Sequence, residues 1–249
     1  MGMLLSFEIR CKSILKYILK SIGFQLIRLQ SGQNGKSIDD DIKKMISSES
    51  PIVIDVGSNE GQSLKEFREL LPNSNIHCFE PSKKVFRVLQ ESAKDLTNVT
   101  LNNCAVGEFP DTLEFMEYDE SVMNSFYKPD VQNWSKPAGS YPVNVVNIDG
   151  YCNDAGLERI DLLKVDTQGH DLKVILGAKK LIESGLVRLI MCEIIFVKLY
   201  EDQPSPYSFL EILSQNGYKL VSFYNICHYH GELGWCDVLF AHESALSDA

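Results

Sequence analysis

The sequence predicts an α/β fold in which a doubly wound, mostly parallel sheet carries helices on both faces and ends in an antiparallel C-terminal hairpin. From residue 51 onward, short apolar runs alternate with segments of helical periodicity, as they do in βαβ units. The runs IVIDV and RLIMCEI are almost continuously apolar, which is typical of strands buried on both faces. The last two strand-like segments are too close in sequence for a crossover helix and therefore predict a hairpin.

The predicted elements follow one another in a regular order. In chain order they occupy 51–56 with 61–71, 75–80 with 81–95, 99–106, a polar stretch, 142–149, 160–166 with 170–184, and 187–196. A helix over 205–217, closed by Gly217, then precedes strands over 218–225 and 234–242. Ligands of such sheets bind beyond the carboxyl ends of the strands, where the strand order reverses. Functional side chains are therefore expected at those strand ends.

The composition predicts one globular domain without a nucleic-acid partner. The 249 residues, 44% hydrophobic and 23% charged, suit a single domain with a substantial core. A formal charge of -10 disfavours binding to phosphate backbones, which needs clustered Lys and Arg. The seven cysteines form no CxxC pair, which predicts a reducing cytoplasmic location and no metal site.

The first thirty residues differ from the rest of the chain. They carry five basic residues against one acidic residue, and their apolar residues recur at helical spacing. We expect an amphipathic helix that either packs on the domain or on the second subunit of a homodimer, or lies peripherally on an anionic membrane surface. The Gly- and Ser-rich stretch 31–37 predicts a boundary near residue 35, so that residues 1–35 form the helix and linker and residues 36–249 the main domain.

A glycine-rich turn, DVGSNEG, follows the first predicted strand. Gly57 and Gly61 let the backbone turn tightly and approach a ligand. Asn59 stands where a dinucleotide-binding GxGxxG turn has its second glycine, and Asp55 and Glu60 bracket the turn. Carboxylates repel a pyrophosphate but suit a ligand with an ammonium and a sulfonium, such as S-adenosylmethionine. The alternative is an ordinary strand-to-helix turn with a capping carboxylate.

Glu80 closes the second predicted strand, 25 residues after Asp55. An acidic residue at about this distance from the glycine turn is placed to accept both hydrogen bonds of a ribose diol. Taken alone, Glu80 fits equally well as a surface carboxylate near the start of a helix.

Five segments in a fixed order carry a family resemblance: IDVGSNEGQS, HCFEPSKKVFRVLQ, NNCAVGE, IDLLKVDTQGHDLKVILGAKKLI and RLIMCEI. Together they resemble the FkbM family of S-adenosylmethionine-dependent methyltransferases over roughly residues 50–240. The FEP step and the K-x-D-x-x-G-x-[DE]-x-x-V-[IL]-x-G-A segment are the most particular to that family. Gln168 and Asp171 replace the glutamates of its frequent D-x-E-G-x-E form.

The resemblance implies a Rossmann-like, seven-stranded methyltransferase domain that binds S-adenosylmethionine and methylates hydroxyl oxygens of sugars, polyketides or related natural products. It also implies roles for single residues: the methionine-side loop from Asp55, Gly57 and Gly61, the ribose contact from Glu80, and the adenine slot from Asn103, Cys104 and Ala105. The last turn offers the apolar flanks and amide groups that an adenine slot needs. Taken alone, Cys104 is a packed thiol.

Two carboxylates close later strands. Asp166 ends the run IDLLKVD and Glu193 ends RLIMCE, so parallel strands bring both into one cleft. Methylating an alcohol requires removal of its proton, which a carboxylate or an imidazole can accept. Asp166, Glu193 and His170, at the start of the next helix, are therefore the candidate bases. In the alternative reading, Asp166 contacts the cofactor ammonium or orients His170, and Glu193 is structural.

Acceptor binding is expected from two segments. Residues 123–142 lack a clear period, as lids and binding loops do. Trp134 there can stack on a sugar face while Asn124 and Ser125 bind its hydroxyls, unless the segment is a disordered excursion. His228 and His230 lie in the expected hairpin connection, and a substrate-facing loop is favoured over a metal pair because a third ligand is lacking.

The leading hypothesis is a cytoplasmic S-adenosylmethionine-dependent O-methyltransferase that acts on a small-molecule or glycan acceptor. A nicotinamide-dependent oxidoreductase on a similar sheet is the main alternative, and Asp55 and Asn59 disfavour it. A protein that binds the cofactor without catalysis is the third, because a fold alone does not determine function.

Overall fold

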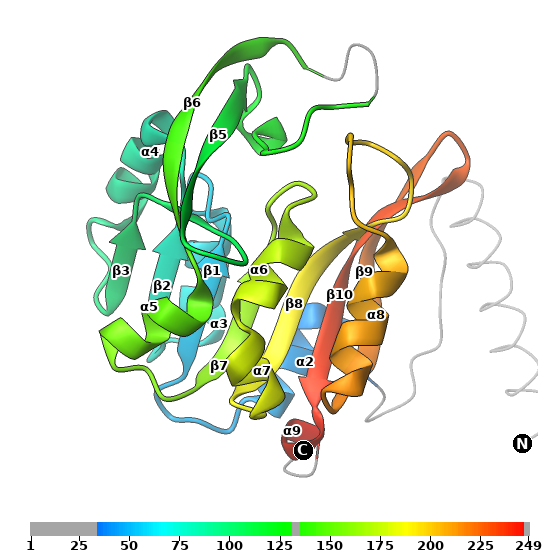
Figure 1. Ribbon diagram of the computed structural model, residues 1–249. Coiled ribbons are helices and arrows are strands. Elements are labelled where there is room, and N and C mark those ends of the chain that lie inside the picture. Colours follow the sequence, from blue (N-terminus) through cyan, green and yellow to red (C-terminus); the bar gives the residue numbers. More distant parts are fainter. Residues whose placement is uncertain (1–33, 131–134, 247–249) are drawn as a thin grey trace, which may run out of the picture.

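A central sheet of seven strands dominates the computed structural model, which describes residues 34–130 and 135–246 (Figure 1). In spatial order the strands are β3 (Val99–Asn102), β2 (Asn75–Phe79), β1 (Ile52–Val56), β7 (Ile160–Val165), β8 (Val187–Ile195), β10 (Glu232–His242) and β9 (Tyr218–Tyr229). The first five pair in parallel, whereas β10 runs antiparallel to both β8 and β9. The predicted doubly wound sheet with an antiparallel C-terminal hairpin is confirmed.

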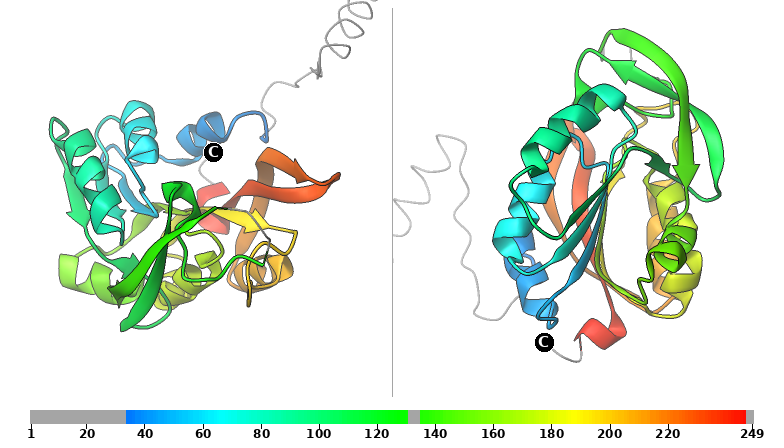
Figure 2. Two further views of the ribbon diagram at one scale, coloured as in Figure 1. Left: turned by 90° about the horizontal axis from the view of Figure 1, so that it is seen from above. Right: turned by 90° about the vertical axis from the view of Figure 1, so that its left-hand side faces the viewer.

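Helices cover both faces of the sheet and give the molecule three layers (Figure 2). One face carries α2 (Ile38–Met45), α3 (Gln62–Leu70) and α4 (Lys83–Ala93), with the short α9 (Glu243–Leu246) at the end of the chain. The other face carries α5 (Ile148–Ala155), α6 (Asp171–Gly177), α7 (Lys179–Glu183) and α8 (Pro206–Gln215). Neighbouring residues of β1 therefore belong to different cores: Val53 packs with the first group of helices and Ile54 with the second.

The strand register aligns the carboxyl ends of the parallel strands. Val56 lies opposite both Phe79 and Val165, and Val165 lies opposite Cys192. The chain proceeds from β1 to β2 and β3 on one side and returns through β7 and β8 on the other. The strand order therefore reverses between β1 and β7, where this fold class places its ligands.

A second, three-stranded sheet lies over this edge of the main sheet (Figures 1 and 2). It contains β4 (Ala105–Val106), β6 (Pro137–Val146) and β5 (Asp111–Tyr118), and the short helix η1 (Ser121–Met123) follows β5. The sequence predicts a polar stretch here, followed by a loop over 123–142. The structure instead has the strand β5, and β6 begins within the expected loop. The alternation of β5 is nevertheless visible, because Leu113 and Phe115 face a small core while Thr112 and Glu114 do not.

Other elements also differ from the prediction. The strand expected over 99–106 is divided between β3 in the main sheet and β4 in the second sheet, and the strand expected over 142–149 is part of β6, which runs from Pro137 to Val146. The helix expected over 170–184 is divided between α6 and α7. At the end of α6 the backbone passes close to Gly107, because a Cβ atom on Gly177 would lie 2.1 Å from the carbonyl oxygen of Gly107. The strand expected over 218–225 continues to Tyr229, so the hairpin turns at His230 and Gly231.

The predicted N-terminal amphipathic helix lies outside the described residues, and the domain boundary near residue 35 stays a prediction. The first described helix, α2, begins after Ser37, whose hydroxyl accepts a hydrogen bond from Asp40 N. Within the two described ranges, no helix is long and apolar enough to cross a membrane.

Candidate active site

Four residues follow the aligned strand ends at one edge of the sheet. Gly57 follows β1, Glu80 follows β2 and Asp166 follows β7, while Glu193 comes directly after the aligned Cys192 of β8. The expectation that separate strands bring these residues together is therefore met by the register.

The glycine turn after β1 touches the turn after β7 at the backbone. Gly57 has φ +78°, and a Cβ atom on it would lie 1.9 Å from the carbonyl oxygen of Asp166. Its N–H donates to Phe79 O at 3.0 Å. Gly61, with φ +92°, lies instead against Leu89 of α4, so its requirement for glycine comes from helix packing.

We expect Gly57→Ala to destabilise the fold by about 2 to 6 kcal/mol, because the left-handed backbone and the clash with Asp166 each cost about 1–3 kcal/mol. Gly156→Ala is the matched control, since Gly156 also has a positive φ of +68° but no atom within 4 Å of its Cβ position. Chemical denaturation of both variants measures the difference. Equal losses of stability would contradict the close contact between the turns.

Glu80 is a buried carboxyl group, 6% exposed, whose two oxygens already accept backbone hydrogen bonds. Asn59 N donates to Oε2 at 3.1 Å, and Ser82 N donates to Oε1 at 2.7 Å. Burial raises the pKa of Glu80 to about 7, although these two donors oppose the shift. Because a carboxylate has about four lone-pair positions, both oxygens can accept further hydrogen bonds from a ligand.

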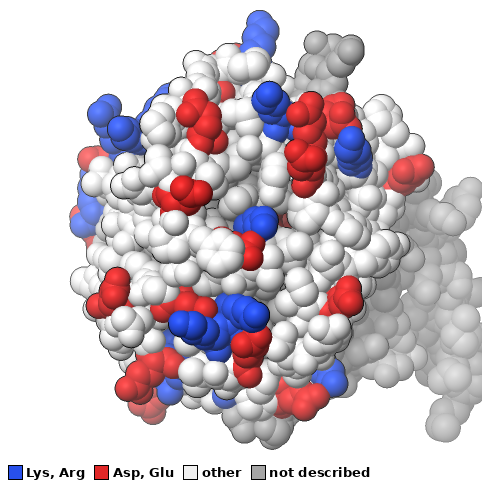
Figure 3. Space-filling model, in the orientation of Figure 1, with Lys and Arg blue, Asp and Glu red and all other residues white. Residues whose placement is uncertain are grey.

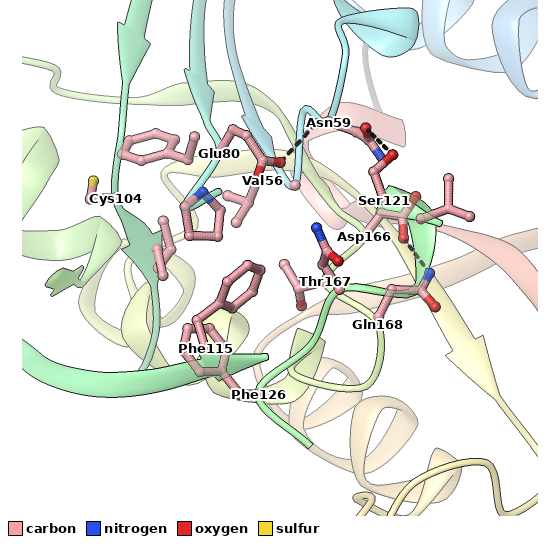
Figure 4. Close-up of a pocket in the computed structure, with 17 residues that line it drawn as sticks. Val56, Asn59, Glu80, Cys104, Phe115, Ser121, Phe126, Asp166, Thr167 and Gln168 are labelled. Carbon is pink, nitrogen blue, oxygen red and sulfur yellow. Dashed lines mark hydrogen bonds between the residues drawn. The ribbon is translucent and has the colours of Figure 1, made fainter. Parts of the chain in front are cut away.

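A pocket opens beside Glu80, between the two sheets (Figure 4). We call it the roofed pocket; its lining residues are Val56, Gly57, Asn59, Phe79, Glu80, Pro81, Cys104, Ala105, Val106, Phe115, Ser121, Val122, Asn124, Phe126, Asp166, Thr167 and Gln168. Cys104 and Phe115 lie on one side and Asp166 on the other. Burial raises the pKa of the Cys104 thiol to about 11, so this side chain is a neutral, apolar part of the wall.

The second sheet supplies the roof of this pocket and is tied to the main sheet by side chains. Ser121 Oγ donates to Asn59 Oδ1 at 3.1 Å. Ser82 Oγ forms a short hydrogen bond to Glu117 Oε1, which also accepts from Tyr141 OH at 2.6 Å. The roof is therefore anchored both to the glycine turn and to the start of α4.

A second cavity adjoins the roofed pocket and shares Gly57, Asn59, Val122 and Asp166 with it. We call it the acidic cavity, because its lining includes the carboxyl groups of Asp39, Glu66, Asp166, Glu193 and Asp237. Asp166 is thus a wall that both spaces share, and its side chain is 43% exposed.

Lys164 is a buried cation beneath this shared wall. Its Nζ lies 3.1 Å from Asp55 Oδ1 and 3.8 Å from Asp166 Oδ2, and it donates to Gly57 O at 3.0 Å. Burial alone would lower the pKa of Lys164, but Asp55 and Asp166 outweigh it and raise the pKa above its usual value. Sequence reasoning missed this residue, although a lysine inside the apolar run IDLLKVD was a visible signal.

Asp55, expected beside the ligand, is instead fully buried under the glycine turn. Ser63 Oγ donates to its Oδ2 at 2.6 Å, and Lys164 neutralises its charge. A buried carboxylate needs a counter-ion, because an unpaired charge there would be costly, so Asp55 pairs with Lys164 and is not available to a ligand. Asp55 therefore supports the turn from below, and Glu60 is exposed and lines neither space.

One amide joins the two predicted carboxylates. Gln168 Nε2 lies 3.2 Å from Asp166 Oδ1 and 3.4 Å from Glu193 Oε2. Burial raises the pKa of Glu193 to about 9, and the negative charges of Asp166, Asp171 and Asp237 act in the same direction. Glu193 therefore keeps its proton at neutral pH.

The sequence predicts that His170 faces the site, but the structure places it elsewhere. It is 6% exposed, its ring lies 4.7 Å from that of Phe126 and 5.8 Å from that of Tyr127, and it lines neither space. Burial, assisted by Lys173, lowers the pKa of His170 to about 4. A neutral imidazole among aromatic rings is a packing residue, which corrects its assignment as a candidate base.

The predicted acceptor residues are dispersed. Asn124 lines the roofed pocket, whereas Ser125 is buried and donates to Gln168 O at 2.7 Å. His228 and His230 are exposed at the end of the C-terminal hairpin and line neither space. Trp134 lies outside the described residues.

The predicted adenine segment is only partly at the pocket. Cys104 and Ala105 line it. Asn103 is exposed, and its Nδ2 donates to the backbone oxygens of Glu80 and Pro81 at 2.8 and 3.2 Å, so it holds the turn after β2 in place.

The part of the chain that the structure describes also carries charged residues outside this site. Over the described residues, no group of three or more His, Cys, Asp or Glu side chains is arranged to hold a metal ion. On the face shown in Figure 3, acidic and basic side chains are interspersed, and no single basic patch dominates it.

Comparison with known proteins gives a consistent set of matches. The family described as "Methyltransferase FkbM domain" matches residues 55–220. The 2-O-methyltransferase NoeI of Sinorhizobium fredii (strain NBRC 101917 / NGR234) is 28% identical over 185 residues, which are 69% of this chain and 74% of that protein. Methyltransferase 1 of Beauveria bassiana (strain ARSEF 2860) is 25% identical over 142 residues, which are 50% of this chain and 57% of that protein.

Two solved structures resemble the chain more distantly. An rRNA methylase from Streptococcus thermophilus has a TM-score of 0.45 and 12% identity, with 81% of this chain and 92% of that chain covered. Magnesium protoporphyrin IX methyltransferase from Synechocystis PCC 6803, solved with bound S-adenosylmethionine, has a TM-score of 0.46 and 10% identity, with 82% and 77% covered.

Proposed function

Because the chain belongs to the FkbM family of S-adenosylmethionine-dependent methyltransferases, we propose that it methylates a hydroxyl oxygen of a sugar, glycan or related natural product. One observation carries the proposal: Asp166 stands on the wall between the roofed pocket and the acidic cavity. A group in that position can serve a methyl donor on one side and an acceptor on the other. Membership of this family also argues against the alternative of a nicotinamide-dependent oxidoreductase.

The roofed pocket fits the nucleoside half of the cofactor. Glu80 offers two acceptor oxygens of the kind that a ribose diol binds, and Cys104, Ala105 and Phe115 supply apolar surface for a base. The carboxyl groups near Asp166 suit the positive sulfonium. When bound, S-adenosylmethionine supplies the methyl group that is transferred.

Asp166 is the residue that we propose as the general base. Lys164 lies 3.8 Å away, and the amide of Gln168 donates to it. Burial and the neighbouring carboxylates raise the pKa of Glu193, which favours its protonated form and makes Asp166 the better proton acceptor of the two. In this proposal Asp166 would take the proton of the acceptor hydroxyl while the oxygen of that hydroxyl receives the methyl group.

The acidic cavity favours an acceptor without negative charge. Among the described residues that line it, Lys164 is the only basic one, and it is already paired with Asp55. A phosphate or carboxylate on the acceptor would meet uncompensated carboxyl groups, whereas neutral hydroxyls can hydrogen-bond to them. Oxygen as the methylated atom is further supported by the name of the relative NoeI, a 2-O-methyltransferase.

Two measurements test the proposal. Calorimetry should detect binding of S-adenosylhomocysteine and none of NAD, and the labelled methyl group of S-adenosylmethionine should be incorporated into carbohydrate of a cell-envelope extract. Binding of NAD alone would contradict the assigned cofactor. Binding of S-adenosylhomocysteine with label found only in nucleic acid or protein would contradict the assigned acceptor class.

A further inference from the structure

Gln168 occupies an unusual position between the two carboxyl groups of the site. Its backbone has φ +52°, in the left-handed region, and its carbonyl oxygen accepts from Ser125 Oγ at 2.7 Å. This conformation directs the side-chain amide to Asp166 and Glu193, at 3.2 and 3.4 Å. A single neutral group thus contacts both carboxyls.

Tyr200 determines which end of the amide faces them. Its hydroxyl donates to Gln168 Oε1 at 2.9 Å, so the NH₂ end must point away from Tyr200, toward the carboxyls. The Tyr200 side chain is fully buried, and a Cβ atom on Gly169 would lie 3.1 Å from its ring. The ring is therefore held in place, and the phenol has little freedom to release the amide.

The surroundings of Glu193 explain why a donor is needed there. The charged groups that act on it are Asp166 at the end of β7, Asp171 of α6, Asp237 opposite it on β10, and Lys164 as the cation. Three negative neighbours and one positive neighbour disfavour ionisation of Glu193. A glutamate in place of Gln168 would add a further carboxyl and remove the donor that both partners use.

We propose that Gln168, oriented by Tyr200, is a positioning residue for methyl transfer: its amide holds Asp166 and Glu193 as one hydrogen-bonded pair and keeps Asp166 free to accept the acceptor's proton. The inference rests on the proposed function, in which Asp166 is the base. It assigns a role to two residues that do not themselves accept the proton: Gln168, which also lines the roofed pocket, and Tyr200, which lines neither space.

Titration of the Glu193 carboxyl by NMR tests the inference on the full chain labelled with ¹³C-glutamate. Glu193→Gln identifies the signal. In Gln168→Glu the titration midpoint should rise by about one pH unit or more, because a donor is replaced by a like-charged group. In Tyr200→Phe it should rise by about 0.4 to 1 pH unit, the equivalent of one lost hydrogen bond.

Tyr207→Phe is the matched control, because Tyr207 is exposed and lines neither the roofed pocket nor the acidic cavity. It should leave the midpoint unchanged. If the midpoint is the same in wild type, Gln168→Glu and Tyr200→Phe, the amide does not hold the pair and the inference is overturned. Binding of S-adenosylhomocysteine by the wild-type protein tests the proposed function separately, and far-UV circular dichroism reports whether each variant is folded.

Discussion

Asp166→Asn is expected to lower the rate of methyl transfer about 10²- to 10⁴-fold, because general-base catalysis contributes in that range. The affinity for S-adenosylhomocysteine should stay within about threefold of the wild-type value. Asparagine has nearly the same shape and keeps an oxygen that can accept from Gln168. It cannot take up the acceptor's proton. The measurement is transfer of label from S-adenosylmethionine to envelope carbohydrate, together with calorimetry.

Two comparison variants make the assignment specific. Glu193→Gln should retain most activity, because it replaces a carboxyl group that is already protonated at neutral pH. His170→Ala should keep the rate of methyl transfer but lower the free energy of unfolding, because it removes a packed ring. If Asp166→Asn abolishes cofactor binding, Asp166 belongs to the cofactor site and another group is the base.

Glu80→Ala is expected to weaken S-adenosylhomocysteine binding at least about tenfold, because hydrogen bonds to a charged group contribute about 1.5 to 3 kcal/mol each. The variant also removes the acceptor for Asn59 N, so part of the loss comes from the glycine turn. Glu69→Ala, which removes an exposed carboxylate on α3, is the control. Unchanged affinity in a folded Glu80→Ala protein would contradict the ribose assignment.

The pKa of Glu80 adds a pH dependence to this result. A pKa of about 7 means that protonation competes with ligand binding near neutral pH, since the ribose hydroxyls donate to the ionised form. Wild-type affinity should therefore decrease as the pH falls below 7. Glu80→Gln has no such group, and its affinity should vary little over the same range.

The main sheet and the site edge were predictable because they depend on local patterns. Apolar runs marked the strands, and Gly57, Glu80, Asp166 and Glu193 each follow or end such a run. Parallel pairing then places strand ends together without further information. The fold class thus follows from periodicity, and the position of the site follows from the residues that stand at the strand ends.

The remaining features depend on contacts between distant parts of the chain. No local pattern shows that Tyr200 reaches Gln168, or that Lys164 neutralises Asp55 from another strand. The wrong assignment of His170 has the same origin, since only the packed structure shows the rings of Phe126 and Tyr127 around it. The roof was missed because its strand β5 alternates within a polar context.

The separation of the molecule into two sheets has an evolutionary consequence. The roof belongs to a sheet of its own. Two side-chain hydrogen bonds join the roof to the main sheet: Ser121 donates to Asn59, and Glu117 accepts from Ser82. Substitutions in β5 and β6 can therefore accumulate without altering the register of the seven main strands, which fixes Glu80 and Asp166. Descendants of such a protein can change the roof of the pocket while they inherit the residues at the strand ends intact.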